Sequence, residues 1–252
     1  MKNILLIGIG AGNPEHITVQ AINALNRTNV FFILDKGYAN DDLLRLRKEI
    51  CQRYMTRDDY RVVQVQDPQR EDDPQSYQAG IEYWHEQRAV LFEQLIGDEV
   101  AEGEVGAFLI WGDPSLYDST LRILDRVLER GAQSFEYQVI PGITSVQALV
   151  AQHRIPLNRI GEPIQITTGR RLAQSPEGDI DNVVVMLDAH CTFDTLTDTD
   201  LHIYWGAYLG TPDEILITGK LKDVSAEIRR VREAARREKG WIMDTYLLRR
   251  PR

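Results

Sequence analysis

Asn3-Ile4-Leu5-Leu6-Ile7-Gly8-Ile9-Gly10-Ala11-Gly12-Asn13-Pro14 opens the chain with an apolar run that ends in a glycine-rich loop. A short, continuous apolar run is typical of a strand buried on both faces of a parallel sheet. Similar runs recur at 30–35, 61–65 and 107–111. A helical segment with Thr18 as candidate N-cap lies between the opening run and the run at 30–35. This alternation predicts an α/β fold with right-handed βαβ crossovers.

Further elements, one long loop and a boundary between two lobes are predicted along the rest of the chain. A helical pattern runs from Leu121 to Leu128 and stops at Gly131, a candidate C-terminal cap. The polar, proline-containing segment 66–78 predicts a long surface loop. We place the boundary between two predicted lobes at 1–115 and 116–252. The further predicted elements are strands at 135–140, 164–167, 183–187, 203–208 and 215–219, and a helix over 224–239.

Composition narrows the classes of protein. With 252 residues, 43% of them hydrophobic, the chain can bury one large core or two modest ones. A net charge of −9 argues against a nucleic-acid partner, which requires clustered Lys and Arg. No apolar run approaches the roughly 20 residues that span a bilayer, so no membrane association is expected. The start of the chain does not have the pattern of a signal peptide, and we expect a cytosolic protein.

Cysteine and histidine give no sign of a disulfide framework or a metal site. Cys51 and Cys191 lie far apart in the sequence, and neither has a second cysteine nearby. The five histidines show no pair at helical metal-ligand spacing. We therefore expect reduced thiols and no bound metal.

The glycine loop resembles a dinucleotide-binding fingerprint but fails its test. Asn13 stands where the third glycine should be, and Pro14-Glu15-His16 delays the helix whose N-terminus would bind a pyrophosphate. Two interpretations remain open. The glycines could simply permit a sharp reversal with positive φ. Alternatively, they leave room for a ligand at the carboxyl end of the strand, where Asp35-Lys36-Gly37 reaches the same edge from the neighbouring strand.

Two further turns each follow a predicted strand and precede a predicted helix. The first is Trp111-Gly112-Asp113-Pro114-Ser115-Leu116-Tyr117, and the second is Ile140-Pro141-Gly142-Ile143-Thr144-Ser145. Such turns present backbone N–H groups and small hydroxyls to whatever lies between them. Asp113 could face a positively charged ligand or could cap backbone N–H groups.

With these three elements in order, the chain resembles the tetrapyrrole methylase family over nearly its whole length. The resemblance implies a two-lobed fold, with an N-terminal parallel α/β lobe, a C-terminal mixed-sheet α/β lobe and the active site in the cleft between them. It also implies S-adenosylmethionine as methyl donor, S-adenosylhomocysteine as product, a tetrapyrrole substrate and a homodimer.

The resemblance carries the family's donor site onto particular positions. Leu187 stands where many relatives have methionine. The implied donor-binding residues are Gly112, Asp113, Leu116, Tyr117, Thr144, Ser145, Leu187, Ala207, Tyr208 and Gly219.

A finer likeness, at 30–37, 111–120 and 153–163, is to family members of aerobic cobalamin synthesis. It implies methylation of precorrin-5 at ring carbon C-1 with loss of acetate, giving precorrin-6A. One alternative is a related enzyme that methylates another ring position. Another is a non-enzymatic tetrapyrrole- or nucleotide-binding protein. Methylation of RNA is disfavoured by the acidic charge.

The acceptor side is predicted from chemistry. Loss of acetate benefits from a general base, and Asp35 is our hypothesis, although an ion pair with a cation such as Lys36 would explain it equally. A substrate with many carboxylates calls for basic residues around the site. The predicted substrate-binding residues are Gly10, Gly12, Pro14, Lys36, Arg154, Arg159, Arg170 and Arg171.

Overall fold

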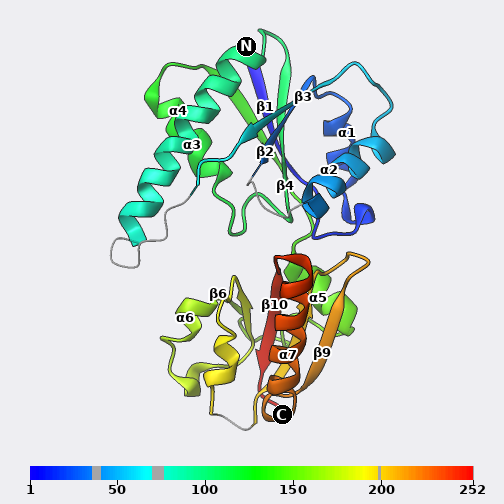
Figure 1. Cartoon of the computed structure of the whole chain (residues 1–252), viewed down its shortest axis with the longest axis vertical. Helices are drawn as coiled ribbons and strands as arrows, with labels where there is room; N and C mark the ends of the chain where they lie inside the picture. The colour runs from blue at the N-terminus through cyan, green and yellow to red at the C-terminus, as the bar shows by residue number, and fades with distance from the viewer. Residues whose placement is uncertain (36–40, 70–76, 198–199, 252) are drawn as a thin grey trace. The chain divides into compact units, whose positions relative to one another are not determined.

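The chain folds into two compact units, each built around its own five-stranded sheet (Figure 1). The computed structural model describes residues 1–35, 41–69, 77–197 and 200–251. The first unit is Met1–Gly10 with Pro14–Thr144, and the second is Ala11–Asn13 with Ser145–Arg252. This division differs from the predicted boundary between residues 115 and 116, because the strand at 135–140 pairs with the first strand of the chain.

The first unit has a parallel sheet in the order β3-β2-β4-β1-β5. Helices α1 and α2 pack on one face of the sheet, and α3 and α4 pack on the other (Figure 1). Its elements are β1 (Lys2–Gly8), η1 (Pro14–His16), α1 (Val19–Leu25), β2 (Val30–Asp35), α2 (Asp41–Tyr54), β3 (Arg61–Gln66), α3 (Tyr77–Glu99), β4 (Val105–Ile110), α4 (Thr120–Arg130) and β5 (Phe135–Ile140).

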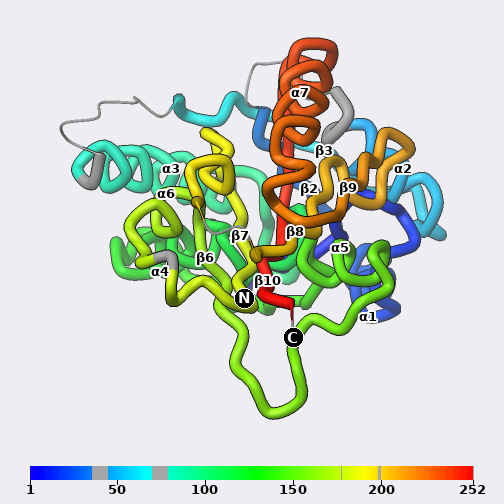
Figure 2. The backbone as a smooth tube through the Cα atoms, turned by 90° about the horizontal axis from the view of Figure 1, so that it is seen from below, coloured from blue at the N-terminus to red at the C-terminus, as the bar shows by residue number. Residues whose placement is uncertain are grey.

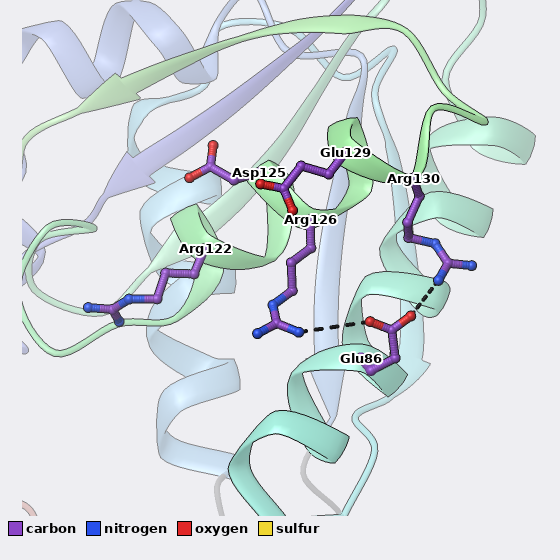
Figure 3. A pocket seen from close by; sticks show the side chains of 6 residues that line it. All are labelled: Glu86, Arg122, Asp125, Arg126, Glu129 and Arg130. Atoms are coloured by element: carbon purple, nitrogen blue, oxygen red, sulfur yellow. Dashed lines mark hydrogen bonds and ion pairs between the residues drawn. The ribbon is translucent and has the colours of Figure 1, made fainter. Parts of the chain in front are cut away.

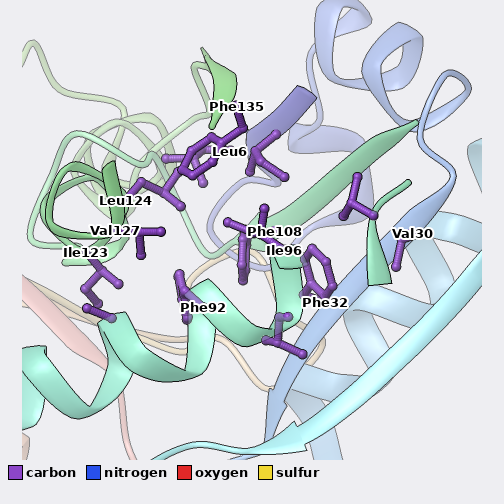
Figure 4. Close-up of a cluster of buried hydrophobic side chains, with 14 of the residues drawn as sticks. Leu6, Val30, Phe32, Phe92, Ile96, Phe108, Ile123, Leu124, Val127 and Phe135 are labelled. Atoms are coloured by element: carbon purple, nitrogen blue, oxygen red, sulfur yellow. The ribbon is translucent and has the colours of Figure 1, made fainter. Parts of the chain in front are cut away.

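Side chains of alternate strand residues fill two separate cores, as expected for a sheet that is covered on both faces. On the side of α3 and α4, the ring of Phe108 stacks on Phe92 at a centroid distance of 4.4 Å and contacts Phe32 (Figure 4). On the side of α1 and α2, Phe31 and Leu109 are buried in the opposite core. The sheet is therefore held in place from both sides, and its carboxyl-terminal edge is set by packing.

The order of the strands corrects one prediction. The strand that ends at Asp35 was expected to neighbour β1, but β4 lies between them. The chain runs from β1 to β2 and β3 and then returns to insert β4 between β1 and β2. Hydrophobic patterning does not encode such an insertion, because every buried parallel strand has the same apolar character.

The second unit has a mixed sheet in the order β6-β7-β10-β8-β9. The helix α7 covers the face that carries Ile203, Trp205 and Ala207. Its elements are α5 (Ser145–His153), β6 (Gln165–Thr168), α6 (Gly169–Leu172), η2 (Glu177–Asp179), β7 (Val183–Met186), η3 (Thr192–Thr195), β8 (His202–Ala207), β9 (Ile215–Lys220), α7 (Leu221–Lys239) and β10 (Asp244–Arg249).

The predicted elements are present within a few residues, and both predicted caps are confirmed. The Thr18 side chain accepts a hydrogen bond from the Ala21 N–H at 3.0 Å, and Gly131 ends α4 with φ 74°. Helices α2 and α6 and strand β10 were not predicted. Of the predicted loop 66–78, residues 70–76 lie outside the described residues. Within the described part of the chain, no helix is long and apolar enough to cross a membrane.

Candidate functional site

Three glycines meet where β1, β4 and β5 end side by side in the first unit. A Cβ atom on Gly142 would lie 2.1 Å from the carbonyl oxygen of Gly112 and 2.9 Å from the Cα of Gly8. A Cβ atom on Gly8 would lie 2.6 Å from the Gly142 nitrogen. Real Cβ atoms essentially never come closer than 3.0 Å to such atoms. The two predicted turns and the glycine loop therefore make direct backbone contact, which only glycine permits.

Asp113 fastens the two turns together. One carboxylate oxygen accepts hydrogen bonds from the Ser115 N–H at 2.8 Å and from the Ser115 hydroxyl, and the other accepts from the Gly142 N–H at 2.8 Å. Burial raises the pKa of Asp113, but the bonds from Ser115 and Gly142 outweigh burial, so its pKa lies below the ordinary 3.8. Asp113 thus caps backbone N–H groups, which was one of its two predicted roles.

The glycine loop pairs with the Gly-Asp-Pro turn. Gly10 and Gly112 exchange backbone hydrogen bonds of 3.3 and 2.8 Å. Gly10 has φ +87°, and a Cβ atom there would lie 2.6 Å from the Cβ of His16. Gly12, in the second unit, has φ +146° and would meet the Leu209 carbonyl oxygen at 2.5 Å. The positive-φ interpretation is confirmed at both glycines. Their contact with substrate, and that of Pro14 in η1, stays a prediction.

The remaining predicted donor-site residues of the first unit follow the same turns. The Leu116 N–H donates to the Asp113 carbonyl at 3.3 Å, which closes the turn. Tyr117 has φ +53° and is 44% exposed, and Thr144 is buried. A left-handed backbone is rare for an aromatic residue and costs about 1–3 kcal/mol, so such residues concentrate at functional sites. The strain at Tyr117 favours the predicted site.

In the second unit, four predicted residues gather at one end of the sheet. In the strand register, Met186 lies opposite Thr245, and Thr245 lies opposite Gly206. Leu187 and Ala207 are the next residues after this row. The Ser145 hydroxyl is 3.0 Å from the Thr245 hydroxyl, so the start of α5 reaches the same end. The four residues that the fold brings together are Ser145, Leu187, Ala207 and Tyr208.

Two of these residues have a left-handed backbone. Leu187 has φ +53° and is 64% exposed, whereas Tyr208 has φ +49° and is buried. The Tyr208 hydroxyl donates to the Trp241 carbonyl at 2.6 Å, so the tyrosine ring is part of the core. What Tyr208 can offer a ligand is therefore its strained backbone.

Gly219 lies apart from this group. In β9 it is opposite Ile203, whereas Ala207 is opposite Ile215. Four residues of strand separate the two positions, which is about 13 Å. A Cβ atom on Gly219 would meet the Val224 side chain at 2.7 Å, so this glycine allows α7 to pack closely. The register therefore separates Gly219 from Ala207 and Tyr208 along the sheet, and its contact with the donor stays a prediction.

A buried ionic network that the sequence did not indicate supports this end of the second sheet. Arg232 of α7 binds both carboxylate oxygens of Asp244, at 2.9 and 3.3 Å, and the carbonyl of Asp188 at 2.8 Å. The Asp188 carboxylate accepts from the Tyr246 hydroxyl at 2.6 Å, and the Trp205 ring N–H donates to Asp244 at 3.0 Å. The network fixes Asp188, directly after Leu187, to Asp244, which pairs with Ala207. The available signal in the sequence was Arg232, an arginine four residues after Ile228 on the buried face of the helix, where a charged side chain needs a partner.

Asp35 ends β2, as predicted. Its carboxylate accepts from the Gln64 side-chain amide at 3.0 Å, and its carbonyl accepts from the Gln66 amide at 3.0 Å. Lys36 lies outside the described residues. The ion pair between Asp35 and Lys36 and the role of general base both stay predictions.

The four predicted substrate arginines all lie in the second unit. Arg159 binds Asp181 at 2.7 Å and Glu162 at 3.2 Å, and it also donates to the Arg250 carbonyl. Two carboxylates of the chain therefore already face its guanidinium group. Arg159 braces the loop between α5 and β6, which stands out from its unit (Figure 2). The exposed members of the set are Arg154, Arg170 and Arg171.

A charged pocket between α3 and α4 is explained without a ligand (Figure 3). Arg130 binds Glu86 and, at 2.7 Å, Glu93, while Arg126 binds Glu82. These partly exposed pairs link two packed helices, where each contributes at most about 1 kcal/mol. The pocket therefore has the character of an interhelical ion-pair ladder.

Comparison with known proteins identifies the family. A sequence model of the tetrapyrrole (corrin/porphyrin) methylases matches residues 3–225. The chain therefore belongs to the tetrapyrrole methylases, which confirms both the predicted membership and the predicted class of enzyme, a methyltransferase. Its two α/β units, one with a parallel sheet and one with a mixed sheet, confirm the predicted fold class.

Individual relatives narrow the comparison. A precorrin-6A synthase (deacetylating) of Sinorhizobium sp. is 53% identical over 250 residues, covering 99% of this chain and 96% of the relative. The crystal structure of a putative cobalamin synthesis related protein from Corynebacterium diphtheriae is 39% identical, with a TM-score of 0.86 over 99% of each chain. The structure of uroporphyrin-III C-methyltransferase from Thermus thermophilus, complexed with S-adenosylhomocysteine, has the same fold, with a TM-score of 0.58. It is 17% identical, and the match covers 97% of this chain and 91% of that one.

Proposed function

We propose that this chain is an S-adenosylmethionine-dependent C-methyltransferase that methylates precorrin-5 at C-1 and releases acetate, giving precorrin-6A. The observation that carries the proposal is the 53% identity to a precorrin-6A synthase (deacetylating) across almost the full length of both chains. The glycine contacts at the ends of β1, β4 and β5 agree with it, because they form the backbone surface that the family's donor motif requires.

The residues present fit a nucleoside-bearing methyl donor. The strand ends of the first unit are lined with backbone, since a Cβ atom is excluded at Gly8 and Gly142. Backbone N–H and C=O groups at such ends can hydrogen-bond a small polar ligand. Gly112, Thr144 and their neighbours would hold the donor in the first unit, and Ser145, Leu187, Ala207 and Tyr208 in the second. S-adenosylmethionine would supply an electrophilic methyl group.

The protein's contribution to methyl transfer is then positioning. An in-line displacement needs the two reacting carbons aligned and water excluded, and fixed orientation can lower a barrier by about 7–11 kcal/mol. Asp113 holds the two turns in register, and the Arg232 network holds the strand ends of the second unit. Neither role needs a nucleophilic side chain.

Release of acetate is a separate step, in which water adds to the acyl carbon, the bond from that carbon to the ring breaks, and its electron pair stays with the ring. We propose Asp35 as the base that accepts a proton from this water. The variant Asp35→Asn is expected to bind S-adenosylhomocysteine as the wild type does and to release acetate at least about tenfold more slowly. Gln64→Ala, which removes the amide that donates to Asp35, is the matched control for the hydrogen bond alone. Wild-type acetate release by Asp35→Asn would remove Asp35 from the mechanism.

The decisive experiment is turnover of precorrin-5 with S-adenosylmethionine, with detection of acetate and the methylated product. Methylation at another carbon without acetate would replace the proposal by a related precorrin methyltransferase. Binding of S-adenosylhomocysteine without any turnover would favour a non-enzymatic binding protein. We further propose a cytosolic homodimer, on the family resemblance. Sedimentation analysis tests the dimer.

A further inference from the structure

The first sheet divides into two pairs of strands near its carboxyl-terminal edge. The register of β2 with β4 ends at the pair Phe32 and Phe108. The register of β2 with β3 continues to Asp35 and Gln66, and that of β4 with β1 continues to Ile110. In the part of the chain that the structure describes, strand pairing therefore does not fix the end of β2 relative to the end of β4.

The two pairs of strands carry different parts of the proposed site. Asp35, the proposed base for acetate release, ends β2 on the side of β3. Asp67, the first residue after β3, donates its N–H to the Asp35 carbonyl at 2.8 Å. Gly112 and Tyr117 belong to the turn after β4, on the side of β1. A reaction that uses both sides needs them at a fixed separation, because a displacement of about 1 Å can cost about 100-fold in rate.

Arg88 of α3 joins the two sides. Its Nε lies 2.9 Å from a carboxylate oxygen of Asp67, and its Nη1 donates to the Ser119 hydroxyl at 2.8 Å. Ser119 stands directly before α4, where a serine hydroxyl usually accepts from a backbone N–H of the first helical turn. Ser119 makes no such cap bond, and the Asp118 carboxylate accepts the Thr120 N–H at 2.7 Å instead. The Ser119 hydroxyl therefore serves the contact with Arg88.

The guanidinium group of Arg88 is held firmly in the core of the first unit. The side chains of Arg88 and Asp67 are 7% and 4% exposed. The guanidinium carbon lies 4.7 Å from the ring centroid of Trp84 and 5.4 Å from that of Phe92, on the same face of α3. The Trp84 ring N–H donates to the Pro68 carbonyl at 2.8 Å, so α3 holds the loop after β3 at a second point.

Stability alone is a weak reason for this buried ion pair. Apolar residues of similar volume often stabilise a core as well as a buried ion pair does, because two charges must lose their water. A methionine would pack between the rings of Trp84 and Phe92. It could not supply the two directed contacts that the planar guanidinium group makes with Asp67 and Ser119. What the arginine contributes is therefore a fixed geometry.

We propose that Arg88 is a positioning residue that locks the loop after β3 to the start of α4. The lock fixes Asp35 relative to the turn that carries Tyr117. This inference rests on the proposed function and deepens it, because it explains how the proposed base and the proposed donor turn stay in one frame. Arg88 acts through Asp67 and Ser119, and the coupling of methyl transfer to acetate release depends on it.

The test uses variants that separate the lock from folding. The double variant Arg88→Met with Asp67→Asn removes the lock and leaves no charge at either position. Ser119→Ala removes one hydrogen bond, and Ser119→Thr keeps the hydroxyl. Arg126→Met is the matched control, because it breaks a partly exposed ion pair between the same two helices. Thermal unfolding checks that each variant is folded.

The readouts are kcat and KM for precorrin-5, acetate released per methyl group transferred, Kd for S-adenosylhomocysteine, and hydrogen exchange over 111–119. The double variant is expected to lower kcat by about tenfold or more, with KM and Kd changed less than about twofold. Its yield of acetate per methyl group should fall below that of the wild type, and exchange over 111–119 should become faster. Ser119→Ala should lower kcat by about threefold or more, and Ser119→Thr should restore it.

The outcomes distinguish this inference from the proposed function. A folded double variant that matches Arg126→Met in kcat, acetate yield and exchange overturns the lock and leaves the proposed function standing. If the double variant does not fold, Ser119→Ala carries the same test, with Ser119→Thr as its reference. A wild type that does not turn over precorrin-5 overturns the proposed function. Exchange over 111–119 then decides on the lock, which stands if exchange is faster in a folded variant and falls if it is unchanged.

Discussion

Replacing Gly142 by alanine tests whether the contact of three glycines holds the first half of the site together. The added Cβ atom would lie 2.1 Å from the Gly112 oxygen, whereas real Cβ atoms keep at least 3.0 Å. The turn must therefore shift by close to an ångström, and the 2.8 Å bond from the Gly142 N–H to Asp113 must lengthen with it. Overpacking of this kind costs about 1–3 kcal/mol, and a lost bond to a charged group costs about 1.5–3 kcal/mol.

A combined loss of about 3 kcal/mol or more is expected, which lowers Tm by about 6 °C or more for a protein of this size. The matched control is Gly178→Ala, because a Cβ atom at Gly178 meets nothing within 4 Å and its φ needs no glycine. That variant is expected to be neutral or stabilised by up to about 1 kcal/mol. Both are measured by thermal unfolding, and S-adenosylhomocysteine binding is measured by titration calorimetry at a temperature where both are folded.

Gly142→Ala should also weaken S-adenosylhomocysteine binding by about tenfold or more, because the proposed donor surface is built on the displaced turn. If Gly142→Ala matches Gly178→Ala in both Tm and affinity, the glycine contact does not organise this site. If it loses stability but binds the ligand normally, the contact serves folding alone.

Three further predictions follow from the buried polar groups. The pKa of Asp113 is lowered on folding, so its ionised carboxylate stabilises the fold above about pH 3.8, and this stability is lost as pH falls through the folded pKa. The difference in unfolding free energy between wild type and Asp113→Asn, measured by urea unfolding, should therefore shrink from pH 7 to pH 3. A difference that stays constant with pH would contradict the assignment. Arg232→Met leaves the Asp244 carboxylate buried without its ion pair and should lower the free energy of unfolding by about 3–5 kcal/mol. The double variant Arg232→Met with Asp244→Asn should regain part of this loss. Purely additive losses in urea unfolding would argue against the pair. Burial raises the pKa of Cys51 to about 11, so little of this thiol is ionised at pH 8. Iodoacetamide at pH 8 should therefore label Cys51 far more slowly in the native protein than in urea, as followed by mass spectrometry. Equal labelling rates would show that the thiol is accessible.

Some residues reveal their roles from local sequence alone. Thr18 and Gly131 were identified as helix caps because capping depends on the chemistry of one residue and its immediate neighbours. Strand β2 was predicted with its observed ends, since a continuous apolar run bounded by polar residues specifies a buried strand. Strand β10 was missed because its apolar core is only Tyr246-Leu247-Leu248 and it follows a long charged helix.

The candidate site was predictable in its residue types but not in its grouping. Gly112, Asp113 and Ser145 came from short motifs whose spacing is visible in one dimension. Gly219 was grouped with Tyr208 although the register of β8 and β9 separates them, because register is decided by cross-strand packing. The Arg232 network joins residues from α7, β10 and the segment after β7, and no local pattern relates them.

The sequence by itself determined the class of fold, the order of the elements, the glycine-rich turns and, through them, the family. These properties depend on residue periodicity and on backbone conformations open to glycine, which are local. Only the tertiary structure decided that β4 separates β1 from β2 and that Asp113 links two turns. Each of these depends on which strands become neighbours, and that choice is made by packing two cores at once, where residues distant in sequence compete for the same space.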